Sequence, residues 1–295
     1  MTLRSVIATG GPPEAIDVAL RLTLVALLLR PMGPWFVGAF VLLLALLGLV
    51  GVGLRAPVTW LALSALIATR LIVEWPLPDN HIYLLAYWCL GVGIALGLAQ
   101  PSRALARIAR QLLGLAFAFA VIWKAVMSPD YRDGRFFAVT LLTDERFAGA
   151  VQLLGGLSAA HLAEDREYLT PLPDGAELLD SPQFHAPARF GRLVHVATWG
   201  GLVLETAVAV LWLAPVRRRA LVIGRHAALL LFCLATYAFA PVAGFGWLLL
   251  VMGLATAAPD QRRIRAAYVG TFCVVLLYSE IPWARLLLAV LTGRS

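Results

Sequence analysis

The sequence predicts an all-α integral membrane protein, a polytopic bundle of eight or nine transmembrane helices with a cytoplasmic N-terminus and one long external loop. Of its 295 residues, 61% are hydrophobic and only 14% are charged. Soluble domains average about 25% charged residues, so this composition excludes a soluble enzyme and a disordered chain. Apolar runs that approach the roughly 20 residues needed to cross a bilayer recur along most of the chain.

These apolar runs, bounded by charges, proline or glycine, are the expected membrane spans. Asp17 and Arg21 interrupt the first span, and their spacing of four residues places them to pair on one helix face. Glu280 and Pro282 interrupt the last span, where we expect a kink or an early helix end. The count of spans, eight or nine, is therefore open. The spans cover residues 14–30, 34–54, 57–74, 82–99, 106–127, 191–214, 219–239, 242–258 and 266–290.

The distribution of arginine sets the expected orientation. Arginines concentrate in alternate loops, most densely at Arg217–Arg219 and between Arg262 and Arg265, and loops of this kind are cytoplasmic. The segment 128–190, which holds ten of the 17 acidic residues, then lies outside. We therefore expect the first five helices in 1–127, an external acidic loop that is re-entrant or interfacial in part in 128–190, and the remaining helices in 191–295.

Two ionisable residues within the spans are candidates for chemistry, because charges inside a membrane are costly and usually functional. Lys124 is the single lysine among 24 basic residues and follows Trp123 at the outer end of the fifth span. It is either a lysine that extends to the outer headgroups or a desolvated lysine that serves as a base. Glu205, near the middle of the sixth span, is either a proton relay or a carboxylate hydrogen-bonded between helices.

The order of residues after Lys124 resembles a known family. A lysine at a helix end is followed by Asp-Tyr-Arg-Asp-Gly at 130–134, which is similar to the vitamin K-dependent γ-carboxylases and the related horizontally transferred transmembrane (HTTM) proteins of bacteria. The Gly-Gly-Leu-Val-Leu-Glu sequence at 200–205 resembles another helix of that family. In the carboxylases the helix-end lysine is the base that starts oxygenation of reduced vitamin K, so the resemblance implies this role for Lys124.

The resemblance and the expected topology together predict one site on the outer side, built around a reduced, vitamin K-like quinone. The residues expected to be catalytic, with the two aspartates holding the lysine, are Lys124, Asp130, Asp133 and Glu205. The residues expected to bind the cofactor are Trp123, Tyr131, His195 and Glu280. No metal site is expected, because no pattern of paired histidines or cysteines occurs in the sequence.

These features favour a membrane enzyme that depends on a quinone or another lipid cofactor, either carboxylase-like or a quinone-linked oxidoreductase. The alternative is a non-catalytic membrane subunit that anchors or helps to mature an exported protein or peptide, and a transporter is the third class. Membrane lipids are expected partners and nucleic acid is not, because the basic charge is spread over the cytoplasmic loops. We expect a multi-pass protein of the cell membrane, specifically the bacterial inner membrane.

Overall fold

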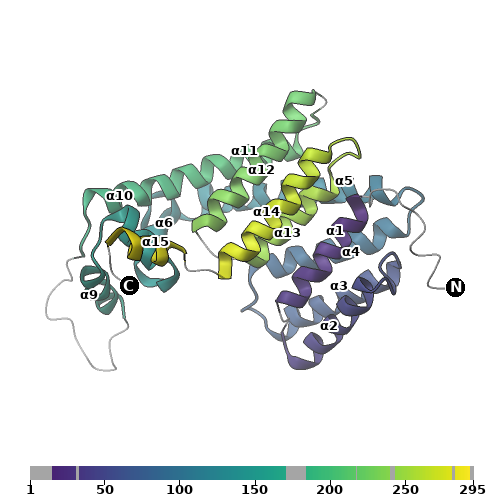
Figure 1. Ribbon diagram of the computed structural model, residues 1–295, viewed down its shortest axis with the longest axis horizontal. Coiled ribbons are helices and arrows are strands. Elements are labelled where there is room, and N and C mark those ends of the chain that lie inside the picture. Colours follow the sequence, from purple (N-terminus) through teal and green to yellow (C-terminus); the bar gives the residue numbers. More distant parts are fainter. Residues whose placement is uncertain are drawn as a thin grey trace. The chain divides into compact units, whose positions relative to one another are not determined.

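The computed structural model describes residues 15–30, 33–170, 184–216, 218–239, 243–280 and 283–292, and all its regular elements in this part of the chain are helices (Figure 1). This confirms the all-α fold class. The longer helices are α1 (Ala15–Leu29), α2 (Trp35–Leu49), α3 (Pro57–Val73), α4 (Asn80–Leu96), α5 (Pro101–Ile122), α11 (Gly201–Leu213), α12 (Arg219–Phe239), α13 (Ala243–Ala255) and α14 (Arg262–Glu280).

Shorter helical elements fill the middle and the end of the chain. The segment after α5 holds η2 (Trp123–Met127), α6 (Pro129–Arg132), α7 (Arg135–Thr143), η3 (Glu145–Phe147), α8 (Ala148–Ala150), η4 (Val151–Gly155) and α9 (Ala159–Leu169). The elements that precede α11, and the last helix of the chain, are α10 (Ala188–His195), η5 (Val196–Gly200) and α15 (Trp283–Thr292). Helix α14 is described as far as Glu280, and the interruption expected at Pro282 lies outside the described residues.

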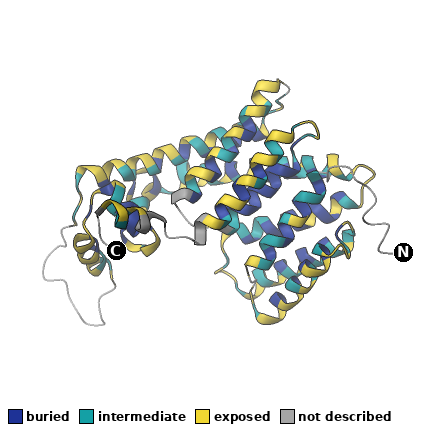
Figure 2. Ribbon diagram, in the orientation of Figure 1, coloured by how far each residue is buried: buried dark blue, intermediate teal, exposed yellow. Residues whose placement is uncertain are grey.

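Three continuous helical runs are long and apolar enough to cross a membrane: Pro101–Met127, Ala188–Leu213 and Arg219–Tyr237. In the most apolar 18-residue stretch of each run, only 28% of the residues are buried in the first two runs and 33% in the third. The remaining residues of these runs are exposed or of intermediate burial, as the colours along the ribbon show (Figure 2). A helix that exposes apolar residues over most of its surface is suited to lipid rather than water, so the three runs support a membrane protein.

The chain divides into two units, of which the first contains Met1–Leu113 and Gly244–Phe272. Buried tryptophans lie in its core, and the indole N–H groups of two of them, Trp60 and Trp88, reach partners on the chain. Trp60 donates to the carbonyl of Leu54 at 2.8 Å, and Trp88 donates to the Thr23 hydroxyl at 3.0 Å. These bonds join α3 to the segment before it and α4 to α1.

Close helix packing in the first unit depends on small residues, as in other helical membrane proteins. A Cβ at Gly93 of α4 would lie 2.8 Å from the Leu61 side chain and 3.2 Å from the Leu61 backbone nitrogen of α3. The expected pair within α1 is wrong, because the Asp17 carboxylate binds Arg55 with two bonds of 2.7 Å. Arg21 donates instead to the carbonyl of Leu49.

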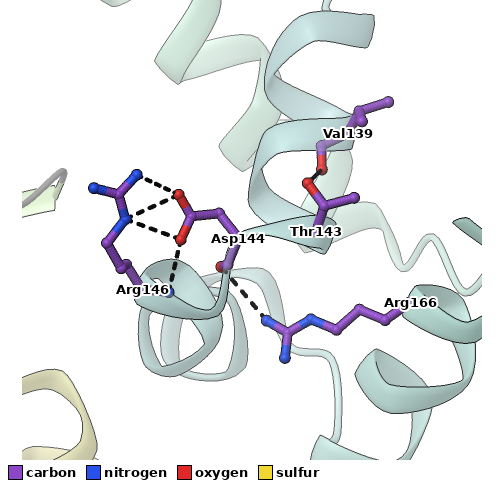
Figure 3. Close-up of polar contacts among 5 residues, drawn as sticks. All are labelled: Val139, Thr143, Asp144, Arg146 and Arg166. Atoms are coloured by element: carbon purple, nitrogen blue, oxygen red, sulfur yellow. Dashed lines mark hydrogen bonds and ion pairs between the residues drawn. The ribbon is translucent and has the colours of Figure 1, made fainter. Parts of the chain in front are cut away.

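The second unit contains Gly114–Ala243 and Cys273–Ser295. The segment between α6 and α10 has its own small apolar core, which is formed by Leu141, Leu142, Phe147, Ala148, Val151, Leu157, Leu162 and Phe190. Polar bonds hold the corner between α7 and η3 (Figure 3). Asp144 accepts from the backbone and guanidinium of Arg146, while Arg166 donates to the carbonyls of Leu142 and Asp144. The segment 128–190 is therefore a packed helical structure over most of its described length.

Candidate functional site

Lys124 lies where the long fifth helix changes its winding. The α-helical part ends at Ile122, and Trp123–Met127 continues as a π-helix. Pro129 then begins α6, after Ser128 in an extended conformation, because the residue before a proline is pushed out of the helical region. π-helical turns are rare and occur frequently at functional sites. A second π-helical turn, Val196–Gly200, precedes α11, so both helices that form the site depart from regular winding beside it.

Lys124 forms an ion pair and hydrogen bond with Glu205 of α11, in which its ammonium donates to the carboxylate Oε1. The Lys124 side chain is 25% exposed and the Glu205 side chain 9%. Lys124 therefore extends toward a buried partner on another helix, and the pairing of the two residues was not predicted. Among the described residues, the second carboxylate oxygen of Glu205 is buried without a hydrogen-bond partner.

Tyr131 covers the pair from the side of α6. The Lys124 ammonium lies 5.0 Å from the centre of the Tyr131 ring, within the range of a cation–π interaction. The Tyr131 hydroxyl oxygen would be 3.4 Å from a Cβ at Gly201, one turn before Glu205. Burial raises the pKa of the Tyr131 phenol, and the Glu205 carboxylate raises it further. The phenol is therefore neutral at physiological pH and its hydroxyl keeps its proton.

Close approach of the two long helices brings Lys124 and Glu205 together. A Cβ at Gly114 would lie 2.6 Å from the Leu213 side chain and 3.3 Å from the Leu213 backbone nitrogen. Gly114 precedes Lys124 and Leu213 follows Glu205, so the two contacts require that the helices run antiparallel. Lys124 is ten residues from the first contact and Glu205 eight, or about 15 Å and 12 Å along the helix axes.

The two aspartates expected to hold Lys124 have another partner. Asp130 binds the Arg135 guanidinium at 2.7 Å and Asp133 binds it at 2.8 Å. Both carboxylates are exposed, at 65% and 46% of their side-chain surface. Hydrogen bonds from the backbone and then the side chain of Arg135 lower the pKa of Asp133. The expectation that these aspartates hold Lys124 is corrected, because the carboxylate that contacts its ammonium belongs to Glu205.

The expected cofactor-binding residues lie in different surroundings. Tyr131 is buried in the cluster, whereas Trp123 is 63% exposed and His195 lies on the exposed face of α10. Glu280 ends α14, but its side chain lies outside the described part of the structure. Among the three whose side chains the structure describes, Tyr131 contacts the Lys124 ammonium with its ring.

Two residues of this region were missed as site candidates. The Thr198 hydroxyl on η5 and the Tyr237 hydroxyl on α12 are buried without a hydrogen-bond partner among the described residues. By spacing along the sequence, Tyr237 falls on one helical stripe with His226 and Cys233, which is typical of a polar packing seam. The pairing of Lys124 with Glu205 could have been predicted from the sequence, because a single lysine and a single carboxylate within two membrane spans are natural partners for each other.

No protein-family model matches the chain, and the comparisons found no similar curated protein or solved structure. In the part of the chain that the structure describes, no group of three or more His, Cys, Asp or Glu side chains is arranged to hold a metal ion. The chemistry of the site is therefore argued from Lys124, Glu205 and Tyr131 themselves.

Proposed function

We propose that the protein is a membrane enzyme that uses a lipid-soluble, quinone-type molecule, with Lys124 as the base and Glu205 as its proton partner. In this proposal the chain crosses the bacterial inner membrane eight or nine times, its N-terminus is cytoplasmic and the segment 128–190 is external. The observation that carries the proposal is the ion pair between Lys124 and Glu205, located between two helical runs that are long and apolar enough to cross a membrane.

The pair is suited to proton transfer because its two members are bonded directly. The Lys124 ammonium donates to Oε1 of Glu205, and movement of that proton onto the carboxylate leaves a neutral amine and a neutral carboxylic acid. The amine then carries the lone pair that a base needs. A poorly solvated site reduces the energy gap between the charged and neutral forms of the pair, because two buried charges are expensive to desolvate.

Tyr131 limits how far the lysine moves. Its ring faces the ammonium at 5.0 Å and its hydroxyl lies against Gly201. The electron-rich face of the ring favours the charged form of lysine, while Glu205 is available to take its proton. These two neighbours keep Lys124 in one orientation, which is the contribution that positioning makes to a general base.

The residues around the pair fit an uncharged ring-bearing lipid. Lys124 and Glu205 compensate each other's charge, and Glu205 Oε2 and the Tyr237 hydroxyl are buried groups that no described residue pairs. Both groups are suited to hold the oxygen-bearing ring of a quinone-type molecule, which supplies reducing equivalents and reacts with oxygen when it is bound in its reduced form. Lys124 would act on a proton of that ring.

Analysis of the lipids bound to the protein tests this function. The protein is purified in nanodiscs, and the extracted lipids are measured by mass spectrometry for wild type, Lys124→Ala and Glu205→Gln. The matched controls are Asp130→Asn and Asp133→Asn, whose side chains pair with Arg135. We expect quinone-class lipid bound to wild type and to both controls. Lys124→Ala and Glu205→Gln should each hold about tenfold less of it, which corresponds to about 1.4 kcal/mol of binding free energy.

Oxygen uptake with added menaquinol separates the enzyme from the non-catalytic subunit. Loss of a general base lowers a rate by about 10²–10⁴-fold, so Lys124→Ala should abolish any uptake that wild type shows while Asp130→Asn keeps it. Absence of quinone from every sample, together with absence of uptake, contradicts the proposal. Bound quinone without uptake would favour the subunit that anchors or matures an exported partner.

A further inference from the structure

Five polar atoms in the second unit are buried without a hydrogen-bond partner among the residues described, and three of them belong to the helices around Lys124: Glu205 Oε2, Thr198 Oγ1 and the Tyr237 hydroxyl. The residues are only 7%, 1% and 3% exposed. Buried polar groups in proteins are nearly always hydrogen-bonded, and a group left unpaired reduces stability. If the three atoms surround one point, that point is suited to a polar group from outside the chain.

Helix register brings Tyr237 to the level of Gly201. Helices α11 and α12 are packed neighbours, as Figure 1 shows, and the Trp212 and His226 rings contact at 5.7 Å. Gly201 is eleven residues before Trp212, and Tyr237 is eleven residues after His226. Because the two helices form an antiparallel hairpin, both positions lie about 16 Å from the ring contact at 1.5 Å per residue.

The fifth helix places Tyr237 near the level of Lys124, the ion-pair partner of Glu205. The Phe117 ring on α5 packs against the Phe232 ring on α12 at 4.7 Å. Since α5 and α12 both run antiparallel to α11, they run in the same direction. Lys124 lies seven residues beyond Phe117 and Tyr237 five residues beyond Phe232, which is about 10 Å and 8 Å in that direction. Tyr237 is also within electrostatic reach of Glu205.

The surface of the helix at Gly201 carries no side chain. Apart from its chain neighbours, the only described atom within 4 Å of a Cβ built there is the Tyr131 hydroxyl oxygen, at 3.4 Å. Glu205 lies four residues after Gly201, so these two positions share one face of α11, and Thr198 lies in the π-helical turn just before it. Buried polar atoms therefore flank a stretch of helix that has only hydrogen at its surface.

We propose that this face of α11 binds a ring hydroxyl of an uncharged lipid over Gly201, with the hydroxyl donating to Glu205 Oε2 and accepting from the Tyr237 hydroxyl. The inference rests on the proposed function, because Glu205 is also the proton partner of Lys124. It adds Gly201 and Tyr237 as binding residues. The carboxylate Oε2 only accepts hydrogen bonds while it is ionised, so it recognises a donor and discriminates against an ether at the same position.

A matched pair of ring lipids tests this assignment. Tritiated 4-nonylphenol carries the hydroxyl donor, and its methyl ether, 4-nonylanisole, lacks it. Both are offered to the full chain in nanodiscs, with binding of labelled phenol measured by scintillation proximity and corrected with empty nanodiscs. We expect wild type to prefer the phenol by about tenfold, the value of one hydrogen bond to a charged acceptor.

Three variants locate the site. Tyr237→Phe removes one hydroxyl and should weaken phenol binding about fivefold, since a neutral hydrogen bond contributes about 1 kcal/mol. Gly201→Ala places a methyl group where the ring hydroxyl is expected and should weaken binding at least tenfold. Its matched control is Gly191→Ala in α10, where a Cβ meets no described atom within 4 Å. This control should bind the phenol as wild type does, and thermal unfolding confirms that each variant is folded.

The inference is overturned if wild type binds the phenol and the ether with equal affinity. It is also overturned if Gly201→Ala and Gly191→Ala bind the phenol equally well. The result is separable from the test of the proposed function. Phenol binding that depends on Gly201 and Tyr237, in a protein without bound quinone or oxygen uptake, supports this site and contradicts the function. Bound quinone in a protein that does not distinguish phenol from ether contradicts this site and supports the function.

Discussion

Removal of one charge from the pair between Lys124 and Glu205 should destabilise the second unit, and the two single substitutions should differ. Lys124→Met leaves a carboxylate that is 9% exposed without its cation. Glu205→Gln leaves an ammonium that is 25% exposed and still faces the Tyr131 ring. The unpaired Glu205 carboxylate is less exposed and keeps fewer contacts than the unpaired Lys124 ammonium, so it lowers the free energy of unfolding more. Lys124→Met should therefore be the more destabilising substitution.

The magnitude follows from the partial burial of the pair. Exposed ion pairs contribute about 0.2–1 kcal/mol, whereas breaking a buried pair costs about 3–5 kcal/mol. With one partner a quarter exposed, we expect about 3 kcal/mol for Lys124→Met and about 2 kcal/mol for Glu205→Gln. The double variant should cost about 3 kcal/mol rather than their sum, which gives a coupling energy of about 2 kcal/mol.

A double-mutant cycle measures this coupling. The free energy of unfolding is obtained for the four proteins by titration with sodium dodecyl sulfate in mixed micelles. The control cycle uses Asp133→Asn and Arg135→Met, an exposed pair for which we expect additive effects. If the Lys124 and Glu205 substitutions are additive within about 0.5 kcal/mol, the two side chains do not interact and the geometry of the proposed site is refuted.

Three further substitutions test the packing around the site and in the first unit. Asp144→Ala should destabilise the protein by about 1 kcal/mol through loss of a helix cap. Hydrogen bonds from Arg146 lower the pKa of Asp144, so this stabilisation is fully present above the ordinary aspartate pKa of about 4 and is lost as the pH falls through the lowered pKa. The unfolding midpoints of wild type and variant should therefore converge only below about pH 4. Gly114→Ala should destabilise by about 1–3 kcal/mol because the added methyl meets the Leu213 side chain and backbone, and a wild-type unfolding midpoint would contradict the close helix contact. Thr23→Val leaves the buried Trp88 indole N–H unpaired and should cost about 1–3 kcal/mol, which thermal unfolding in detergent measures.

In the segment 128–190, local sequence patterns predict the helices but not the contacts between them. Its apolar runs predict helices at Phe136–Leu142 and Phe147–Leu157, and α7 followed by η3, α8 and η4 occupies these ranges. The sequence predicts an external acidic loop here and indicates no partner for Asp144. Asp144 instead holds the corner between α7 and η3. A side chain two residues from its partner is visible in the sequence, but the turn that brings them together is decided by the packing of Leu142 and Phe147 in one core.

The residues after Lys124 show where sequence proximity misleads. Asp130 and Asp133 are the nearest carboxylates along the chain, and the resemblance to carboxylases singles them out. The turn after Pro129 directs both toward Arg135, which lies only two residues after Asp133. Neighbours in sequence satisfy these exposed charges locally, and local pairs cost little chain entropy.

Composition and periodicity alone determined that this chain is helical and apolar, that a lone lysine stands at the end of a long helix, and that Glu205 is isolated in another. These properties are local, because a helix and its lipid-facing surface depend on residues three and four apart. Only the tertiary structure decided that Lys124 and Glu205 pair. That contact joins residues 81 positions apart, so it depends on how α5 and α11 pack, which the contact of Gly114 with Leu213 sets.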